Sequence, residues 1–169
     1  MLPFFGRLVL GALVGRFPAL VEDCARTAGA REIMDFGPVF LPESRRLSLP
    51  VMRKAEILPP DGRGQRLAVC SFALSLLAED RRRELFSNMS VCAEFALFLD
   101  FKLPERNLEW PAFLLFSPLR RIASHGRLEA EGGMEGILYK ERTRCIVLAR
   151  HTLAGGALCA VLLRNPTSR

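Results

Sequence analysis

The chain has 169 residues, half of them hydrophobic, and its formal net charge is +6. This length is typical of one domain and the apolar share suffices for a buried core, so we expect a single domain over residues 1–169. A mild basic excess favours acidic partners in general. The sequence has no stripe of bases interleaved with aromatic residues, so we expect no nucleic-acid partner. The densest basic run, Arg81–Arg83, predicts the solvated face of a helix.

The cysteines and histidines form no recognisable metal or redox motif. None of the five cysteines forms a C-x-x-C pair, and four of them lie within apolar runs. This favours small buried thiols in a reducing cytoplasm over a disulfide framework or a zinc site. We therefore expect a cytoplasmic protein with no bound metal.

Residues 1–29 are predicted to form an N-terminal helical segment. The apolar stretch Leu8–Gly15 lies between Arg7 and Arg16. It is too short to span a bilayer, which takes about 20 apolar residues. We expect it to pack on the domain or to make a weak contact with a membrane surface. The spacing of apolar residues then predicts a helix over Phe17–Ala28.

A short strand and a proline-rich connection come next. Glu32–Gly37 is typical of a strand that ends in a turn. Residues 38–66 contain five prolines and two glycines. Proline at this density leaves little room for regular structure, so we interpret this region as a connection.

The patterning after residue 66 is strong. Leu67–Phe72 is an unbroken apolar run, typical of a strand that is buried on both faces. The elements predicted after it are a helix over Leu74–Met89 whose outer face includes Arg82, a buried strand over Phe95–Phe101, a helix from Pro111, a short helix over Met134–Tyr139, and two strands over Cys145–Ala149 and Ala157–Leu163. The short glycine-containing link between the last two strands predicts an antiparallel hairpin. The order as a whole predicts an α/β fold with a parallel sheet and helices on both faces.

Several segments resemble the class I S-adenosylmethionine-dependent methyltransferases, in particular the type 11-like branch. "AREIMDFG" (30–37) resembles the family's first strand and the start of its glycine loop. "LAVCSFALSLLAEDRRRELF" (67–86) resembles the fourth strand and its helix, and "ALFLDFKLPERN" (96–107) resembles the fifth strand and the loop after it. "GGMEGIL" and "TLAGGALCAVLLR" are similar to the closing elements. The resemblance implies a Rossmann-like sheet.

The resemblance also implies a cofactor, S-adenosylmethionine. Its crevice would be lined by Asp35, Gly37, Ser71 and Phe72, at the carboxyl ends of the first and fourth strands. Two alternatives stay open. Asp35 is equally well explained as a carboxylate that caps a turn. For Ser71 and Phe72, core packing is the favoured explanation.

The sequence departs from the family's pattern in the cofactor region. Pro38, Val39 and Phe40 stand where loop glycines are expected, and proline has no N–H to offer a ligand. Lys54 stands where the family commonly has an Asp, and Arg66 where an acidic residue often opens the fourth strand.

Nor is the family's second strand, with its ribose-binding acid, recognisable; Glu43 is the nearest acidic residue. We therefore expect a truncated sheet that keeps strands 1, 4 and 5 and the hairpin, and has lost two strands. The first strand would then lie at an open edge that favours a homodimer.

Two functions follow from these observations. The first is a methyltransferase for a small or lipid-like acceptor, including quinone-like ones, with Glu105, Arg106 and Asn107 on the acceptor side after the fifth strand. The second is a catalytically inactive relic that acts as a binding or scaffold module. The altered cofactor loop favours the second.

Overall fold

The computed structural model describes residues 16–37, 47–53, 65–105, 107–115, 130–141 and 145–165. In chain order, its elements are α2 (Phe17–Ala28), β1 (Glu32–Asp35), β2 (Val51–Arg53), β3 (Arg66–Ser71), α3 (Ala73–Leu76), α4 (Glu79–Cys92), β4 (Phe95–Phe101), the 3₁₀ turn η3 (Asn107–Glu109), α5 (Trp110–Leu115), α8 (Gly133–Glu141), β5 (Ile146–Leu153), the 3₁₀ turn η4 (Ala154–Gly156) and β6 (Leu158–Arg164). The predicted segments Leu8–Gly15 and Pro38–Phe40 and the residues Glu43, Lys54 and Arg106 lie outside the described residues.

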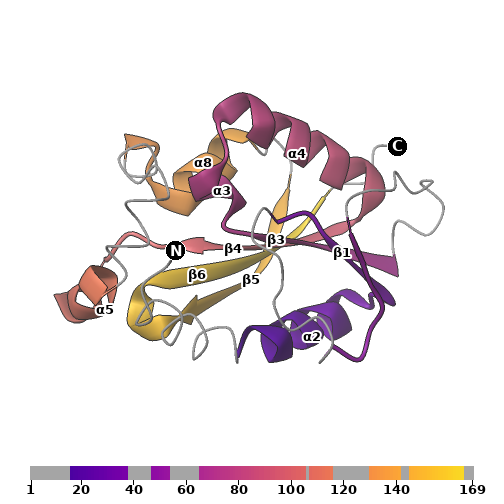
Figure 1. Cartoon of the computed structure of the whole chain (residues 1–169), viewed down its shortest axis with the longest axis horizontal. Helices are drawn as coiled ribbons and strands as arrows, with labels where there is room; N and C mark the ends of the chain where they lie inside the picture. The colour runs from indigo at the N-terminus through magenta and orange to yellow at the C-terminus, as the bar shows by residue number, and fades with distance from the viewer. Residues whose placement is uncertain are drawn as a thin grey trace, which may run out of the picture.

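The strands form one six-stranded sheet in the order β2-β1-β3-β4-β6-β5. β2, β1, β3 and β4 are parallel neighbours, and β6 is antiparallel to both β4 and β5. Helices cover both faces: α3, α4 and α8 lie above the sheet in Figure 1, and α2 lies below it. The α/β class, the parallel pairing of the first strand with the Leu67 segment, and the closing hairpin are therefore confirmed.

The core lies in the middle of the sheet, where the chain is most continuously apolar. All residues of β3 are buried, and in β4 only Phe95 is partly exposed. Both strands are covered on two faces, which is why their sequences show no polar alternation. On the far side of the sheet, α2 begins with a proline in its first turn and ends at Gly29, whose φ of 65° closes the helix.

The connection between β1 and β3 is less simple than its sequence predicts. Val51–Arg53 forms β2, which pairs in parallel with β1. The prediction that β1 lies at the open edge is therefore wrong, and so is the prediction that the family's second strand is missing. The edges of this sheet are β2 and β5. A homodimer through an open sheet edge stays a prediction.

The predicted helix over 74–89 is divided, and one of its outward residues is in fact buried. Leu77 adopts an extended conformation, so α3 ends there and α4 begins after Ala78. The Arg82 side chain points inward, because its guanidinium donates to the Leu74 carbonyl at 3.2 Å and pairs with Glu131 at 2.7 Å. Arg81 and Arg83 are exposed as predicted, each paired with a glutamate of α4.

Candidate functional site

The strand order changes direction between β1 and β3. From β1 the chain steps outward to β2, and from β3 it steps the other way to β4. In open parallel sheets, ligands bind in the crevice outside the carboxyl ends of the two strands that flank such a point. β1 ends at Asp35 and β3 ends at Ser71. The fold therefore brings the two predicted cofactor segments together at the position where this architecture binds ligands.

Asp35 organises the turn after β1. The residue is buried, and its Oδ1 accepts a hydrogen bond from the Gly37 N–H at 2.9 Å. The Phe36 N–H donates to the Val69 carbonyl at 2.8 Å, which ties this turn to β3. The turn-capping interpretation of Asp35 is thus realised in the structure, and the Gly37 N–H is already used within the protein.

Ser71 ends β3, and Phe72 follows it directly. Ser71 is only 3% exposed, and its Oγ has no hydrogen-bond partner among the described residues. Phe72 has a φ of 57°, in the left-handed region that costs an L-residue about 1–2 kcal/mol. Its ring lies 5.2 Å from that of Phe101, so it also contributes to packing. An orphaned buried hydroxyl and a strained backbone in consecutive residues are features that concentrate at functional sites.

Asp100 is a fully buried carboxyl that was not among the residues predicted for the site. Its Oδ2 accepts the Ser75 N–H at 3.0 Å and its Oδ1 accepts the Phe101 N–H at 2.8 Å. Burial raises the pKa of Asp100 to about 6, although these hydrogen bonds act in the opposite direction. The available signal was a single acidic residue within the apolar run of β4, since carboxylates are almost never fully buried without partners.

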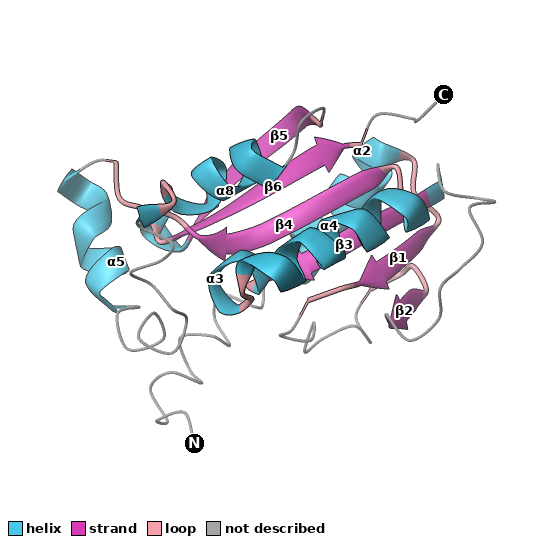
Figure 2. Cartoon of the chain, turned by 90° about the horizontal axis from the view of Figure 1, so that it is seen from above, coloured by secondary structure: helices cyan, strands magenta, loops and turns pink. Residues whose placement is uncertain are grey.

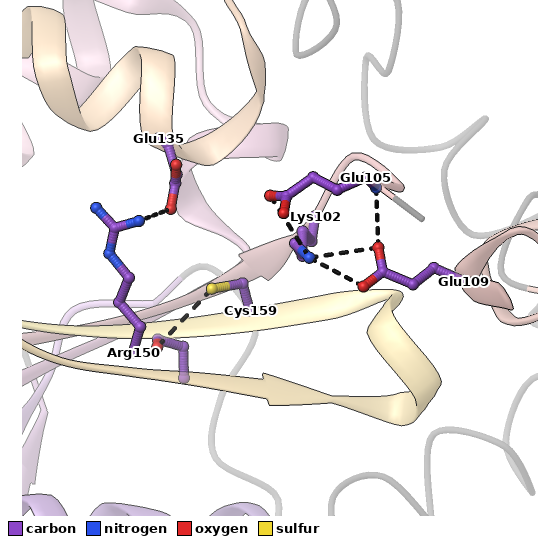
Figure 3. Close-up of polar contacts among 7 residues, drawn as sticks. Lys102, Glu105, Glu109, Glu135, Arg150 and Cys159 are labelled. Carbon is purple, nitrogen blue, oxygen red and sulfur yellow. Dashed lines mark hydrogen bonds and ion pairs between the residues drawn. The ribbon is translucent and has the colours of Figure 1, made fainter. Parts of the chain in front are cut away.

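The predicted acceptor-side loop follows β4, the strand that pairs with β3. Lys102 Nζ lies 3.1 and 3.3 Å from the two carboxylate oxygens of Glu109 and 3.5 Å from Glu105 Oε1 (Figure 3). Glu109 also accepts the Glu105 N–H at 2.9 Å. Burial acts to lower the pKa of Lys102, but the two carboxylates outweigh it and the pKa is raised. Asn107 begins η3 and is exposed.

The thiol in this region has the properties of a structural cysteine. Cys159 of β6 is buried, and burial raises the pKa of its thiol (Figure 3). A thiol of raised pKa stays protonated and is a weak nucleophile. The described residues contain no group of three or more potential metal ligands.

The residues at these two strand ends suit one part of S-adenosylmethionine better than another. The ammonium and sulfonium groups of this molecule are cationic, and a buried carboxylate or an unpartnered hydroxyl can pair with or accept from such groups. Asp35 provides the carboxylate. Ser71 provides the hydroxyl, two residues beyond Val69, the residue of β3 that pairs with Asp35. The resemblance calls for an acidic residue at the end of the second strand to hold the ribose hydroxyls, whereas β2 ends in Arg53 and contains no acidic residue.

Comparisons with known proteins agree with the fold. The structure resembles the crystal structure of the methyltransferase domain of bacterial CtHen1-CN, with a TM-score of 0.50 and 11% sequence identity. The similarity covers 90% of this chain and 99% of that domain. No family model matches the sequence, and no curated protein matches it. The chain therefore has the methyltransferase fold.

Proposed function

We propose that the chain binds S-adenosylmethionine in the crevice between β1 and β3 and acts as a methyltransferase on a small or lipid-like acceptor. The observation that carries this proposal is the placement of Asp35 and Ser71. Both lie at the carboxyl ends of the two strands that flank the change of strand direction, and both are buried. Burial of a hydroxyl without a partner costs about 1–3 kcal/mol, which a ligand that bonds to it would recover.

The residues of the chain have distinct roles in this proposal. Asp35 holds a cationic end of the ligand and, through Gly37, the shape of the turn. Ser71 orients the ligand by a hydrogen bond. Glu105, whose side chain is 67% exposed after β4, faces the acceptor side, and Lys102 fixes its position. The cofactor, when bound, supplies an activated methyl group.

A second candidate is a non-catalytic binding module. It is favoured by β2, which ends in Arg53 where the resemblance calls for an acid that holds the ribose. It is also favoured by the Gly37 N–H, which donates to Asp35 rather than facing outward. In this proposal the chain binds a smaller cationic ligand between β1 and β3 and catalyses no methyl transfer.

The experiment that tests both is calorimetric titration of the full chain with S-adenosylmethionine and S-adenosylhomocysteine. Saturable binding with one site per chain supports the first proposal, and no heat at millimolar ligand refutes it. The matched variants are Asp35→Asn, which keeps an oxygen to cap Gly37, and Asp35→Ala, which does not.

The two variants separate binding from folding. We expect Asp35→Asn to weaken S-adenosylmethionine binding about tenfold or more at nearly unchanged stability, because only the charge is lost. Asp35→Ala should also lose about 1 kcal/mol of stability with the turn cap. Unchanged affinity in Asp35→Asn would show that the carboxylate is only a cap.

A further inference from the structure

Asp100 is a buried titratable group to which the proposed function gives no role. It is the second-last residue of β4, and its side chain is fully buried. Burying a carboxyl costs free energy unless hydrogen bonds compensate for it, so the groups that bond to it indicate what it does. One of these groups lies on α3, which begins at Ala73, directly after Ser71 and Phe72.

Asp100 caps the first turn of α3 in place of the helix's own N-cap residue. A helix usually begins at a Ser, Thr, Asp or Asn whose side chain accepts an N–H of the first turn. The N-cap of α3 is Phe72, which makes no such bond. The Ser75 N–H donates instead to Asp100 Oδ2 at 3.0 Å. The other oxygen, Oδ1, accepts the Phe101 N–H at 2.8 Å, so both carboxylate oxygens are used.

α3 depends on this cap because it is short. No helix in the described part of the chain is long and apolar enough to cross a bilayer, and α3, with four residues, is the shortest α-helix among them. A helix of this length is not stable without tertiary contacts. Figures 1 and 2 both show α3 beside the carboxyl end of β4. Asp100 therefore fastens α3 to the sheet at the edge where β1, β3 and β4 end.

Ser75 connects this anchor to the end of β3. Its Oγ donates to the Phe72 carbonyl at 3.3 Å, and the Leu76 N–H donates to the same carbonyl at 3.2 Å. The Phe72 N–H donates to the Leu99 carbonyl of β4 at 2.7 Å. Phe72 is thus held from α3 and from β4 in its left-handed conformation. Because Ser71 directly precedes it, the same contacts fix the end of β3, where the Ser71 Oγ is buried without a partner among the described residues.

The charged groups around Asp100 are engaged by other partners. Charged and titratable side chains on the elements packed around it, of which α3 has none, are Cys70 on β3, Lys102 on β4, Arg82 on α4, Glu131 and Glu135 before and on α8, and Cys159 on β6. Lys102 pairs with Glu105 and Glu109, Arg82 pairs with Glu131, and Glu135 pairs with Arg150. Cys159 is the cross-strand neighbour of Asp100, and the raised pKa of its thiol keeps it neutral near pH 6. Burial, opposed by the hydrogen bonds to Asp100, places the pKa of Asp100 at about 6.

We propose that Asp100 is a positioning residue for S-adenosylmethionine, whose carboxylate acts through Ser75 to hold Phe72 and the Ser71 hydroxyl in the geometry that binds the ligand. For its ligand, this inference rests on the proposed function. When the carboxyl is protonated, one of its oxygens carries a hydrogen and no longer accepts one of the two N–H groups. Binding is therefore regulated by pH: it is tighter when Asp100 is charged and weaker when Asp100 is neutral.

The first test measures the affinity of the full chain for S-adenosylmethionine by calorimetry, from about pH 5 to about pH 7.5. For the wild type, we expect the affinity to fall about fivefold as the pH drops through about 6, a loss typical of one hydrogen bond. Asp100→Asn keeps one acceptor oxygen and has an NH₂ group in place of the other. Its affinity should be about fivefold lower at the upper pH and constant below it. A step near pH 6 that persists in Asp100→Asn belongs to another group, such as His151, and overturns the proposal.

Gly29→Ala is the matched control for a loss of stability. Gly29 ends α2, which lies on the opposite face of the sheet from α3 in Figure 1, and its φ of 65° strains any other residue. This variant should bind S-adenosylmethionine with the affinity and the pH dependence of the wild type. If it loses as much affinity as Asp100→Asn, the effect of Asp100 is one of stability alone and the proposal is overturned.

A second test needs no ligand. Backbone amide NMR spectra of the full chain are recorded over the same pH range. We expect the amide signals of Ser71, Phe72 and Ser75 to shift together, with a midpoint near pH 6, in the wild type and not in Asp100→Asn. A shift at Ser75 alone would show that Asp100 caps α3 without holding the turn, which overturns the proposal.

The two tests together separate this inference from the proposed function. If the wild type and Asp100→Asn bind S-adenosylmethionine equally at every pH, the positioning role is refuted and the proposed function stands. If neither protein binds it at any pH, the proposed function is refuted, and the amide titration alone decides whether Asp100 holds the turn.

Discussion

The buried guanidinium of Arg82 depends on Glu131 for neutralisation. The Arg82 side chain is 2% exposed and that of Glu131 is 15% exposed, and the closest nitrogen and oxygen lie 2.7 Å apart. Removing one partner of a buried ion pair costs about 3–5 kcal/mol, because the other charge is left without compensation. Arg82 keeps its hydrogen bond to the Leu74 carbonyl. We therefore place Glu131→Ala at the lower end, at a loss of about 3 kcal/mol.

This loss is a large share of the free energy of unfolding, which for a native domain is about 5–15 kcal/mol. It is measured by urea unfolding of the full chain, followed by circular dichroism. The matched control is Glu84→Ala. Its partner Arg81 is 69% exposed, and Glu84 is 53% exposed at a distance of 3.0 Å. An exposed pair of this kind contributes about 0–1 kcal/mol.

A further variant separates the charge from the space it fills. Replacing both partners, in Arg82→Met/Glu131→Leu, should restore most of the stability, since no charge is then left in the interior. If Glu131→Ala and Glu84→Ala lose equal stability, the pair does not hold α4 to the segment before α8, and the reasoning is refuted.

Two other predictions follow from buried contacts. The pKa of Asp100 is raised from 3.8 to about 6, so between these values the folded chain holds a proton that the unfolded chain has lost. Stability should therefore fall by about 3 kcal/mol as pH rises from about 4 to about 6 and stay level above it, relative to Asp100→Asn in urea unfolding at each pH. Gly156 has a φ of 98°, and an added Cβ would lie 2.5 Å from the Glu109 side chain. Gly156→Ala should cost about 2–3 kcal/mol by thermal unfolding, against about 1 kcal/mol for Gly29→Ala, which has the strain but no clash; equal losses would contradict this account.

The sheet could be predicted from sequence because its central strands are encoded locally. The apolar runs at Leu67–Ser71 and Phe95–Phe101 are long enough to be recognised without knowing their neighbours. β2 has no such signal. It has three residues, begins after Pro50 and ends in Arg53, and it exists because β1 offers it a paired edge, beginning with the Ile33 N–H donating to the Pro50 carbonyl at 3.0 Å.

Arg82 and Asp100 show a second limit of sequence patterns. Arg82 lies in a charged run, and its helical position gave no reason to separate it from Arg81 and Arg83. Its burial is set by Glu131, which lies 49 residues away in sequence. Helical spacing does not encode an ion pair between residues so far apart in the sequence. The spacing therefore predicted correctly that Arg81 and Arg83 are exposed, but it was wrong for Arg82.

Ser71 and Phe72, the two predicted residues at the end of β3, do not give equal support to a bound ligand. The left-handed backbone of Phe72 costs about 1–2 kcal/mol, but an aromatic pair such as that with Phe101 contributes about 0.5–1.5 kcal/mol beyond area burial. Packing therefore offsets much of this cost, so the backbone of Phe72 supports a ligand less strongly than the Ser71 hydroxyl does. Ser71 has no such compensation, because its buried Oγ has no partner among the described residues and an alanine would pack as well. Ser71→Ala should keep or raise the stability of the chain and should weaken S-adenosylmethionine binding. If Ser71 has no role in ligand binding, the substitution changes the stability in the same way but leaves the affinity unchanged.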